Sequence, residues 1–94
     1  MNPGRVDKNQ QQIVSALRKL GCSVAITSDV GVGFPDLVIG LNGVNFMVEL
    51  KSEGGKLRES QVKFHKKWQG QIATCWNLEE VLKVIGYVTE DING

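Results

Sequence analysis

The chain has 94 residues, a formal net charge of +1 and a hydrophobic content of 41%. These values are typical of one globular domain over residues 1–94 and exclude a disordered chain. No apolar run approaches the roughly 20 residues that cross a bilayer, and the polar N-terminus does not resemble a signal peptide. We therefore expect a cytoplasmic protein with no membrane partner.

The first third of the chain predicts a helix, a strand and a loop. Residues 7–20 form an amphipathic pattern that stops at Gly21. Its apolar stripe consists of Ile13, Val14, Leu17 and Leu20. Residues 22–27 predict a strand, and residues 29–34 form a glycine-bearing loop that ends at Pro35.

The centre of the chain, residues 36–52, predicts a β-hairpin that turns at Asn42-Gly43. Asp36 opens the first arm, and Glu49 and Lys51 lie two residues apart near the end of the second. Side chains alternate along a strand, so Glu49 and Lys51 share one face. Pairing across the hairpin would place Asp36 beside Glu49. Two carboxylates and an ammonium group then meet at one edge of the sheet.

This arrangement suits a divalent cation and phosphodiester chemistry. Mg²⁺ prefers oxygen ligands, and one or two carboxylates suffice beside substrate phosphates. The main-chain carbonyl of Leu50 is a further candidate ligand, and Lys51 could hold the attacking water or neutralise developing charge. Turn chemistry at Asp36 and a solvated face at Glu49 are the ordinary alternatives. The strongly apolar flanking segments favour function, because charges at the ends of buried strands need partners.

The second half of the chain predicts short elements separated by loops. In order they are a flexible loop at 53–56, a helix at 59–69, a strand at 71–76, a helix at 78–85, and a polar tail at 87–94 that begins as an edge strand. Gly70 is the expected cap of the first of these helices; Asn77 precedes the second and Gly86 follows it. The order α-β-β-β-α-β-α indicates an α/β sandwich around a mixed sheet, with the strand topology left open.

Four side chains of the helix at 59–69 are spaced to share one face, namely Gln61, Phe64, His65 and Trp68. Phe64 and Trp68 are expected in the core. Gln61 could reach the site and orient water or a phosphate oxygen; by its pattern alone, a partly buried structural glutamine is the simpler interpretation. His65 is expected to touch a nucleic-acid backbone or to pack at the rim, rather than to carry protons.

Charge is unevenly distributed along the chain. Residues 51–67 contain six basic and two acidic side chains, whereas the segment from residue 77 onward is mainly acidic. A basic half suits a phosphate backbone better than a membrane surface, although a basic helix is often only a solvated face. The candidate phosphate-binding residues are Lys56, Arg58, Lys63, Lys66 and Lys67. Cys22 and Cys75 have no ligand-like spacing and are expected to be buried, reduced thiols.

Pro35-Asp36 followed by Glu49-Leu50-Lys51 resembles the signature of the PD-(D/E)xK nuclease superfamily. The segment 33–40, the Gly55-Lys56-Leu57 run and Gln61 resemble the virus-type replication–repair (VRR-NUC) branch. The segment from Gln71 to Val81 resembles the last strand and closing helix of the same branch. The match covers nearly the whole chain. The resemblance implies a small restriction-endonuclease-like sandwich in which Asp36, Glu49 and the Leu50 carbonyl bind Mg²⁺ or Mn²⁺.

The chain departs from the family pattern in its first helix. Many relatives place a metal-binding glutamate there, and the corresponding position falls at Gln10 or Gln11. An amide offers an oxygen but no negative charge, so metal affinity should fall and a second ion is in doubt. Asp7, about one turn earlier, is a further substitute.

The function that follows from the residues and the resemblance is a metal-dependent DNA endonuclease without an organic cofactor. Asp36, Glu49, Lys51 and Gln61 would be catalytic, with Gln10 among the metal ligands. Stand-alone members of the family imply a homodimer, often encoded by a phage or prophage, that favours branched DNA such as four-way junctions. The alternative is a catalytically weak DNA-binding module of the same fold. A protein-interaction surface without nucleic-acid affinity is a further competitor.

Overall fold

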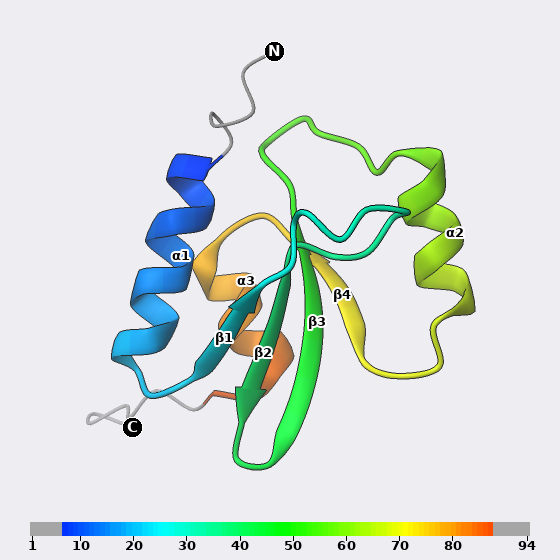
Figure 1. The fold of residues 1–94 in the computed structure, drawn as a ribbon. Helices are drawn as coiled ribbons and strands as arrows, with labels where there is room; N and C mark the ends of the chain where they lie inside the picture. Colours follow the sequence, from blue (N-terminus) through cyan, green and yellow to red (C-terminus); the bar gives the residue numbers. More distant parts are fainter. Residues whose placement is uncertain (1–6, 88–94) are drawn as a thin grey trace.

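A computed structural model describes residues 7–87, which form a mixed sheet and three helices in the order that the sequence predicts (Figure 1). The elements are α1 (Asp7–Lys19), β1 (Ser23–Ile26), β2 (Leu37–Leu41), β3 (Val44–Leu50), α2 (Glu59–Lys67), β4 (Ile72–Cys75) and α3 (Leu78–Ile85). The strand order is β1-β2-β3-β4, with β3 and β4 parallel and the other neighbours antiparallel. The predicted edge strand in the tail falls largely on residues 88–94, outside the described part. No described helix is long and apolar enough to span a membrane.

The turn between β2 and β3 fixes the register that positions the site. Asn42 and Gly43 both have positive φ angles, 53° and 83°, as a two-residue type I′ turn requires. This turn pairs Leu41 with Val44 and, four residues further along, Leu37 with Val48. The residues just beyond that last pair are Asp36 and Glu49, so the hairpin brings these two acids level with each other.

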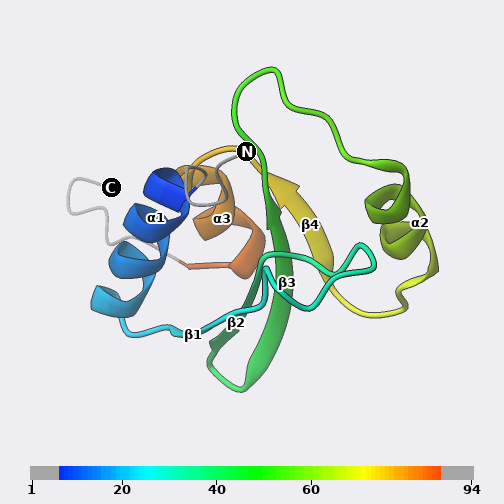
Figure 2. The same ribbon diagram turned by 45° about the horizontal axis from the view of Figure 1, so that its top comes forward.

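The main core lies between one face of the sheet and the two helices α1 and α3, which Figure 2 shows on the same side. The buried residues in it are Ile13, Val14, Leu17, Cys22, Leu37, Ile39, Phe46, Val48, Cys75, Val81 and Ile85. In β3, Phe46 and Val48 point into this core. By alternation Met47, Glu49 and Lys51 point to the opposite face.

Helix α2 stands apart from this core. Figures 1 and 2 show it beyond β4, with the loop between β1 and β2 reaching across to it. None of its residues belongs to the main core. Contact with the loop is nevertheless close, because a Cβ atom at Gly33 would lie 2.3 Å from the carbonyl oxygen of Ser60. Phe34 and Phe64 add an edge-to-face contact with ring centroids 5.3 Å apart.

Two predictions about helix ends were wrong. Helix α1 ends at Lys19, so Leu20 is exposed rather than part of the apolar stripe. Helix α2 ends at Lys67, and the expected core residue Trp68 is 43% exposed. Trp68 leaves the helix with extended backbone (φ −74°, ψ 128°) and stacks on Phe64.

Two further predictions on core and cap residues need correction. Phe64 is half-buried and lies outside the main core. Gly70 does not cap α2; it leaves room for the indole, since a Cβ there would lie 2.8 Å from Nε1 of Trp68. By contrast, both cysteines are buried and unpaired as expected, and burial raises the pKa of both thiols.

Candidate active site

Asp36 is held in place by the end of β1 and by the backbone of β3. The Thr27 N–H donates to the Asp36 carbonyl oxygen at 2.7 Å, and the Thr27 hydroxyl donates to the Pro35 carbonyl at 2.8 Å. Across the hairpin, the Leu50 N–H donates to Asp36 Oδ2 at 2.9 Å. The carboxylate therefore has a fixed orientation toward the end of β3.

Glu49 lies beside Asp36 and is almost completely enclosed. It is 2% exposed, and its Oε2 accepts a hydrogen bond of 2.8 Å from Gln61 Nε2. The Lys51 Nζ is 3.9 Å from the same oxygen, so the two side chains share a face as predicted. Within residues 9–87, no donor reaches the buried Glu49 Oε1. One carboxylate oxygen is thus left without a partner inside the protein.

The charge state of Glu49 reflects this environment. Burial is the main cause that raises its pKa to about 8. The neighbouring Asp36 raises the pKa further through its charge, and through a hydrogen bond that only the protonated form of Glu49 can donate to it. Lys51 and Arg58 oppose the shift. Because burial and a like charge both disfavour the ionised form, the pair of acids needs a proton or a cation between them.

Gln61 connects the first turn of α2 to Glu49. Its side chain is buried, its Oε1 accepts the Arg58 N–H at 2.7 Å, and its Nε2 donates to Glu49. A primary amide carries two N–H donors, so one remains for another acceptor. The sequence predicted that Gln61 reaches the site; the hydrogen bond to Glu49 was not foreseen.

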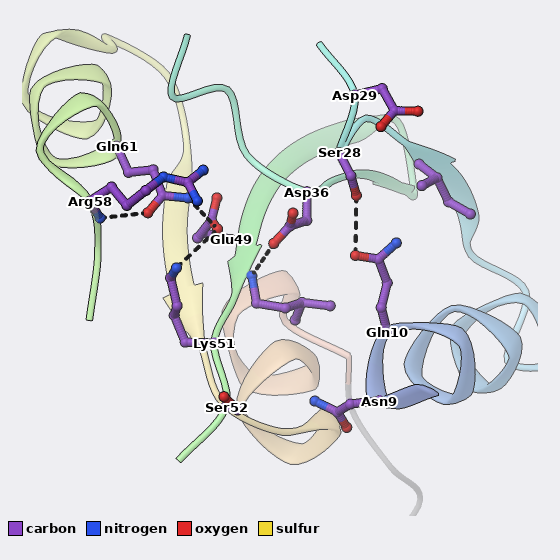
Figure 3. Close-up of a pocket in the computed structure, with 12 residues that line it drawn as sticks. Asn9, Gln10, Ser28, Asp29, Asp36, Glu49, Lys51, Ser52, Arg58 and Gln61 are labelled. Atoms are coloured by element: carbon purple, nitrogen blue, oxygen red, sulfur yellow. Dashed lines mark hydrogen bonds and ion pairs between the residues drawn. The ribbon is translucent and has the colours of Figure 1, made fainter. Parts of the chain in front are cut away.

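These side chains border a cleft of about 530 Å³ (Figure 3). The predicted residues that line it are Gln10, Asp36, Glu49, Leu50, Lys51 and Gln61. Gln10 approaches from the side opposite Gln61, and its Oε1 accepts a hydrogen bond of 3.2 Å from Ser28 Oγ. Gln11 instead borders a different hollow beside Arg18. Asp7 lies outside the side chains that the structure describes.

Sequence reasoning missed several residues of the cleft wall, namely Asn9, Ser28, Asp29 and Ser52, and it assigned Arg58 only to phosphate binding. Ser28 and Asp29 follow β1 after Thr27, and β1 ends where its antiparallel neighbour β2 begins. That pairing would have predicted their position beside Asp36. Arg58 is the N-cap residue of α2 and precedes Gln61 by three residues, so a site that contains Gln61 brings Arg58 close as well.

The fold agrees with that of a solved structure over most of its length. A solved structure described as "VRR_NUC domain" superposes with a TM-score of 0.68 at 25% sequence identity, covering 87% of this chain and 95% of that one. The chain has the VRR-NUC fold. No family model matches the sequence, and no curated protein does. The resemblance read from Pro35-Asp36 and Glu49-Leu50-Lys51 is therefore confirmed by the fold, that of a nuclease-like domain.

Within this VRR-NUC fold, the donor set fits a hard divalent cation. Asp36 and Glu49 offer carboxylate oxygens, one of them unpartnered, and Leu50 lines the same cleft with its carbonyl as a candidate ligand. The described residues contain no group of three His, Cys, Asp or Glu side chains able to hold a metal. In Figure 3, Asp29 points away from Asp36, and the neutral oxygen donors of the cleft wall include Gln10.

The five predicted phosphate-binding residues lie in three places. Arg58 lines the cleft, whereas Lys63 and Lys67 border a hollow on α2; Lys56 and Lys66 are exposed elsewhere. His65 is half-buried, and burial lowers its pKa. Its Nε2 is enclosed and has no hydrogen-bond partner in the described part of the chain. This position favours packing at the rim over contact with a nucleic-acid backbone.

The fit to a cation predicts a pH-dependent stabilisation. Cation binding requires ionised Glu49, and the raised pKa means that a proton competes with the cation below about pH 8. Millimolar Mg²⁺ or Mn²⁺ should therefore raise the melting temperature more at pH 8.5 than at pH 6, measured by differential scanning calorimetry. Glu49→Gln should abolish the difference. An equal shift at both pH values, or in the variant, would contradict the assignment.

Proposed function

We propose that the chain is a Mg²⁺- or Mn²⁺-dependent endonuclease that hydrolyses phosphodiester bonds in DNA without an organic cofactor. The observation that carries the proposal is the pairing of Asp36 with Glu49, whose Oε1 is buried without a partner, beside the Lys51 ammonium group. The VRR-NUC fold supports the same conclusion.

Asp36, Glu49 and the Leu50 carbonyl would hold the cation. The chemistry that a bound Mg²⁺ or Mn²⁺ supplies is polarisation of a phosphoryl oxygen and activation of water. Lys51 lies in a partly buried position next to Glu49, where its charge would stabilise the negative charge that builds on the phosphorus oxygens. In hydrolysis, water forms the new P–O bond, the ester P–O bond breaks, and the leaving oxygen takes up a proton.

Gln61 and Arg58 would assist from the α2 side. Gln61 holds Glu49 through one N–H, and its second N–H would orient the attacking water or a phosphate oxygen. Arg58 lines the same cleft and would bind a phosphate. Lys56, Lys63, Lys66 and Lys67 would contact the backbone further from the bond that is cut. Gln10 would give the cation a neutral oxygen.

We further propose that the enzyme acts as a homodimer on branched DNA such as four-way junctions. A two-fold axis would present two sites to opposed strands, which suits paired incisions. This step comes from the family resemblance, as does a phage or prophage origin. The proposed location is the cytoplasm of a bacterial host. Sedimentation velocity tests the dimer, and equimolar cleavage of single-stranded, duplex, flap and four-way substrates tests the preference.

The enzyme proposal predicts cleavage that depends on the cation and on Asp36. Supercoiled plasmid and a four-way junction should be cut in Mn²⁺ or Mg²⁺ and remain intact in EDTA. Asp36→Asn should lower the rate at least about 100-fold, since several kcal/mol of charge stabilisation depend on the site. Exposed Glu79 provides the control, because Glu79→Gln should cut normally.

The second candidate function is a DNA-binding module with little activity. It is favoured by Gln10 at a position where a carboxylate would complete the site, and by Asp29, which lines the cleft but points away from Asp36. The described residues therefore contain no group of three acids able to hold a metal. Salt-sensitive DNA binding with no cleavage in either metal would favour this candidate. A protein that neither binds nor cuts DNA would refute the endonuclease and the binding module. A protein-interaction surface would then be the remaining candidate.

A further inference from the structure

Outside the cleft lies an aromatic patch that we define as Phe34 of the loop between β1 and β2, Phe64 of α2, and Trp68, which follows the end of α2. The Phe34 and Phe64 rings meet edge-to-face, and the Phe64 and Trp68 rings stack with centroids 5.3 Å apart and planes within 14°. Trp68 is 43% exposed. A hollow of about 430 Å³ lies against the patch, lined by Val32, Ser60, Lys63, Phe64, Lys67 and Trp68.

The backbone around the patch and its hollow adopts unfavourable or irregular conformations. Val32, on the wall of the hollow, has a φ angle of 46° and is 81% exposed. A β-branched residue in the left-handed region is strained, and such strain accumulates at functional sites. Trp68 leaves the helix to stack on Phe64, and Gly70 makes room for its indole. None of the patch residues belongs to the main core.

The positive charge around the hollow indicates which class of molecule binds there. Lys63 and Lys67 line it, and Lys66 is exposed on the same helix. Lys63 has an acidic partner, since its Nζ lies 3.7 Å from Glu59 Oε2, so these three lysines and Glu59 leave an excess of two positive charges. A second copy docked through the same face in a two-fold dimer would bring lysines against lysines. Flat aromatic faces flanked by lysines are the combination that binds single-stranded nucleic acid, whose bases stack while its phosphates pair with the charges.

The position of the patch connects it to the cleft. Gln61, near the start of α2, donates to Glu49, and Phe64 lies about one helical turn beyond Gln61 on the same side. Trp68 follows about one turn later. We propose that the aromatic patch stacks unpaired bases of the DNA strand whose backbone occupies the cleft. The inference rests on the proposed function and specifies its substrate class as DNA with unpaired bases next to the bond that is cut.

The test uses binding without catalysis. A fluorescently labelled oligothymidine is titrated by anisotropy in EDTA at low salt with the wild type, Trp68→Ala and Trp76→Ala. Trp76 is the matched control because it is 42% exposed, close to the 43% of Trp68, and lies outside the patch. Trp68→Ala should raise Kd about tenfold and Trp76→Ala less than about twofold. Circular dichroism checks that all three proteins are folded.

A second oligonucleotide isolates stacking from charge. With abasic sites in place of the bases, wild type and Trp68→Ala should bind equally, because the phosphates remain and the bases do not. Equal Kd values for the wild type and Trp68→Ala on oligothymidine would overturn the proposal. So would dissociation of an oligomer by Trp68→Ala in sedimentation velocity, which would make the patch a protein interface.

The outcomes separate this inference from the proposed function. A protein that never cuts DNA but binds bases through Trp68 would refute only the endonuclease. A protein that cuts in Mn²⁺ but binds oligothymidine equally well without Trp68 would refute only base stacking.

Discussion

Replacing Glu49 by glutamine should give a protein that unfolds at higher temperature above pH 8 and no longer cuts DNA. The wild-type carboxylate is 2% exposed, lies beside Asp36 and has one oxygen without a donor. A glutamine has the same shape, keeps an oxygen for Gln61 and carries no charge to bury. The variant therefore loses a cation ligand while it removes an unfavourable charge.

The sign of the pH dependence follows from the raised pKa. Glu49 titrates at about 8 in the folded protein against an ordinary 4.5. Its contribution to stability is complete below pH 4.5 and is lost as pH rises through 8, because only the folded state holds the proton in this interval. Without metal, the variant should match the wild type near pH 4.5 and exceed it by about 2–4 kcal/mol at pH 9.

Urea denaturation in EDTA at pH 5, 7 and 9 measures this difference, and plasmid nicking in Mn²⁺ measures the activity, which should fall at least about 100-fold. Glu79→Gln removes an exposed acid and should leave both properties unchanged. A variant that is less stable than the wild type at pH 9 would show that ionised Glu49 does not destabilise the fold. A variant that still cuts DNA would show that Glu49 is not an essential cation ligand.

Gly33→Ala should detach the loop between β1 and β2 from α2. Gly33 has a φ angle of +85°, and an added Cβ would lie 2.3 Å from Ser60 O and 2.7 Å from Ser60 C. Backbone atoms cannot move aside as a flexible side chain can, so the loop or the helix must shift. Gln61, one residue after Ser60, would then lose its position beside Glu49. We expect a loss of about 2–4 kcal/mol in the free energy of unfolding and a large loss of cleavage.

Gly31 supplies a matched control in the same loop. Its φ angle of +86° is nearly identical, but an added Cβ would meet nothing within 4 Å. Gly31→Ala therefore carries only the backbone cost of about 1–2 kcal/mol. The difference between the two variants in urea denaturation measures the packing of the loop on α2. Equal losses would mean that the helix is not held by this contact.

The sequence predicts those parts of the fold whose causes are local. Helix α3 begins and ends at the predicted residues because Asn77 accepts a hydrogen bond from the Glu80 N–H and Gly86 adopts a φ angle of +73°. The hairpin register follows from the Asn42-Gly43 turn, which also explains why Asp36 and Glu49 meet.

Other features depend on contacts between distant segments and could not be predicted from the sequence. Directly after the end of α2, Trp68 stacks on Phe64, and helix propensity carries no information about this contact. The bond from Leu50 N–H to Asp36 and the bond from Gln61 to Glu49 arise only once the hairpin and α2 are placed. A glycine pattern likewise cannot reveal that Gly33 lies against Ser60.

The sequence alone could have predicted that Gln10, rather than Gln11, lies at the candidate metal site. Gln10 precedes Ile13, Val14 and Leu17 by three, four and seven residues, the spacing of one helix face. Because those three residues are buried against the sheet, Gln10 lies on the same side and Gln11 is turned toward solvent.

The separation of α2 from the main core has an evolutionary consequence. The acids are fixed by β2 and β3, whose stability comes from α1 and α3. In the proposed enzyme, substitutions on the outer surface of residues 59–68 would alter which substrates are accepted at little expense to the stability of the sheet. New specificities would therefore arise on this helix while the proposed catalytic residues of the sheet are inherited unchanged.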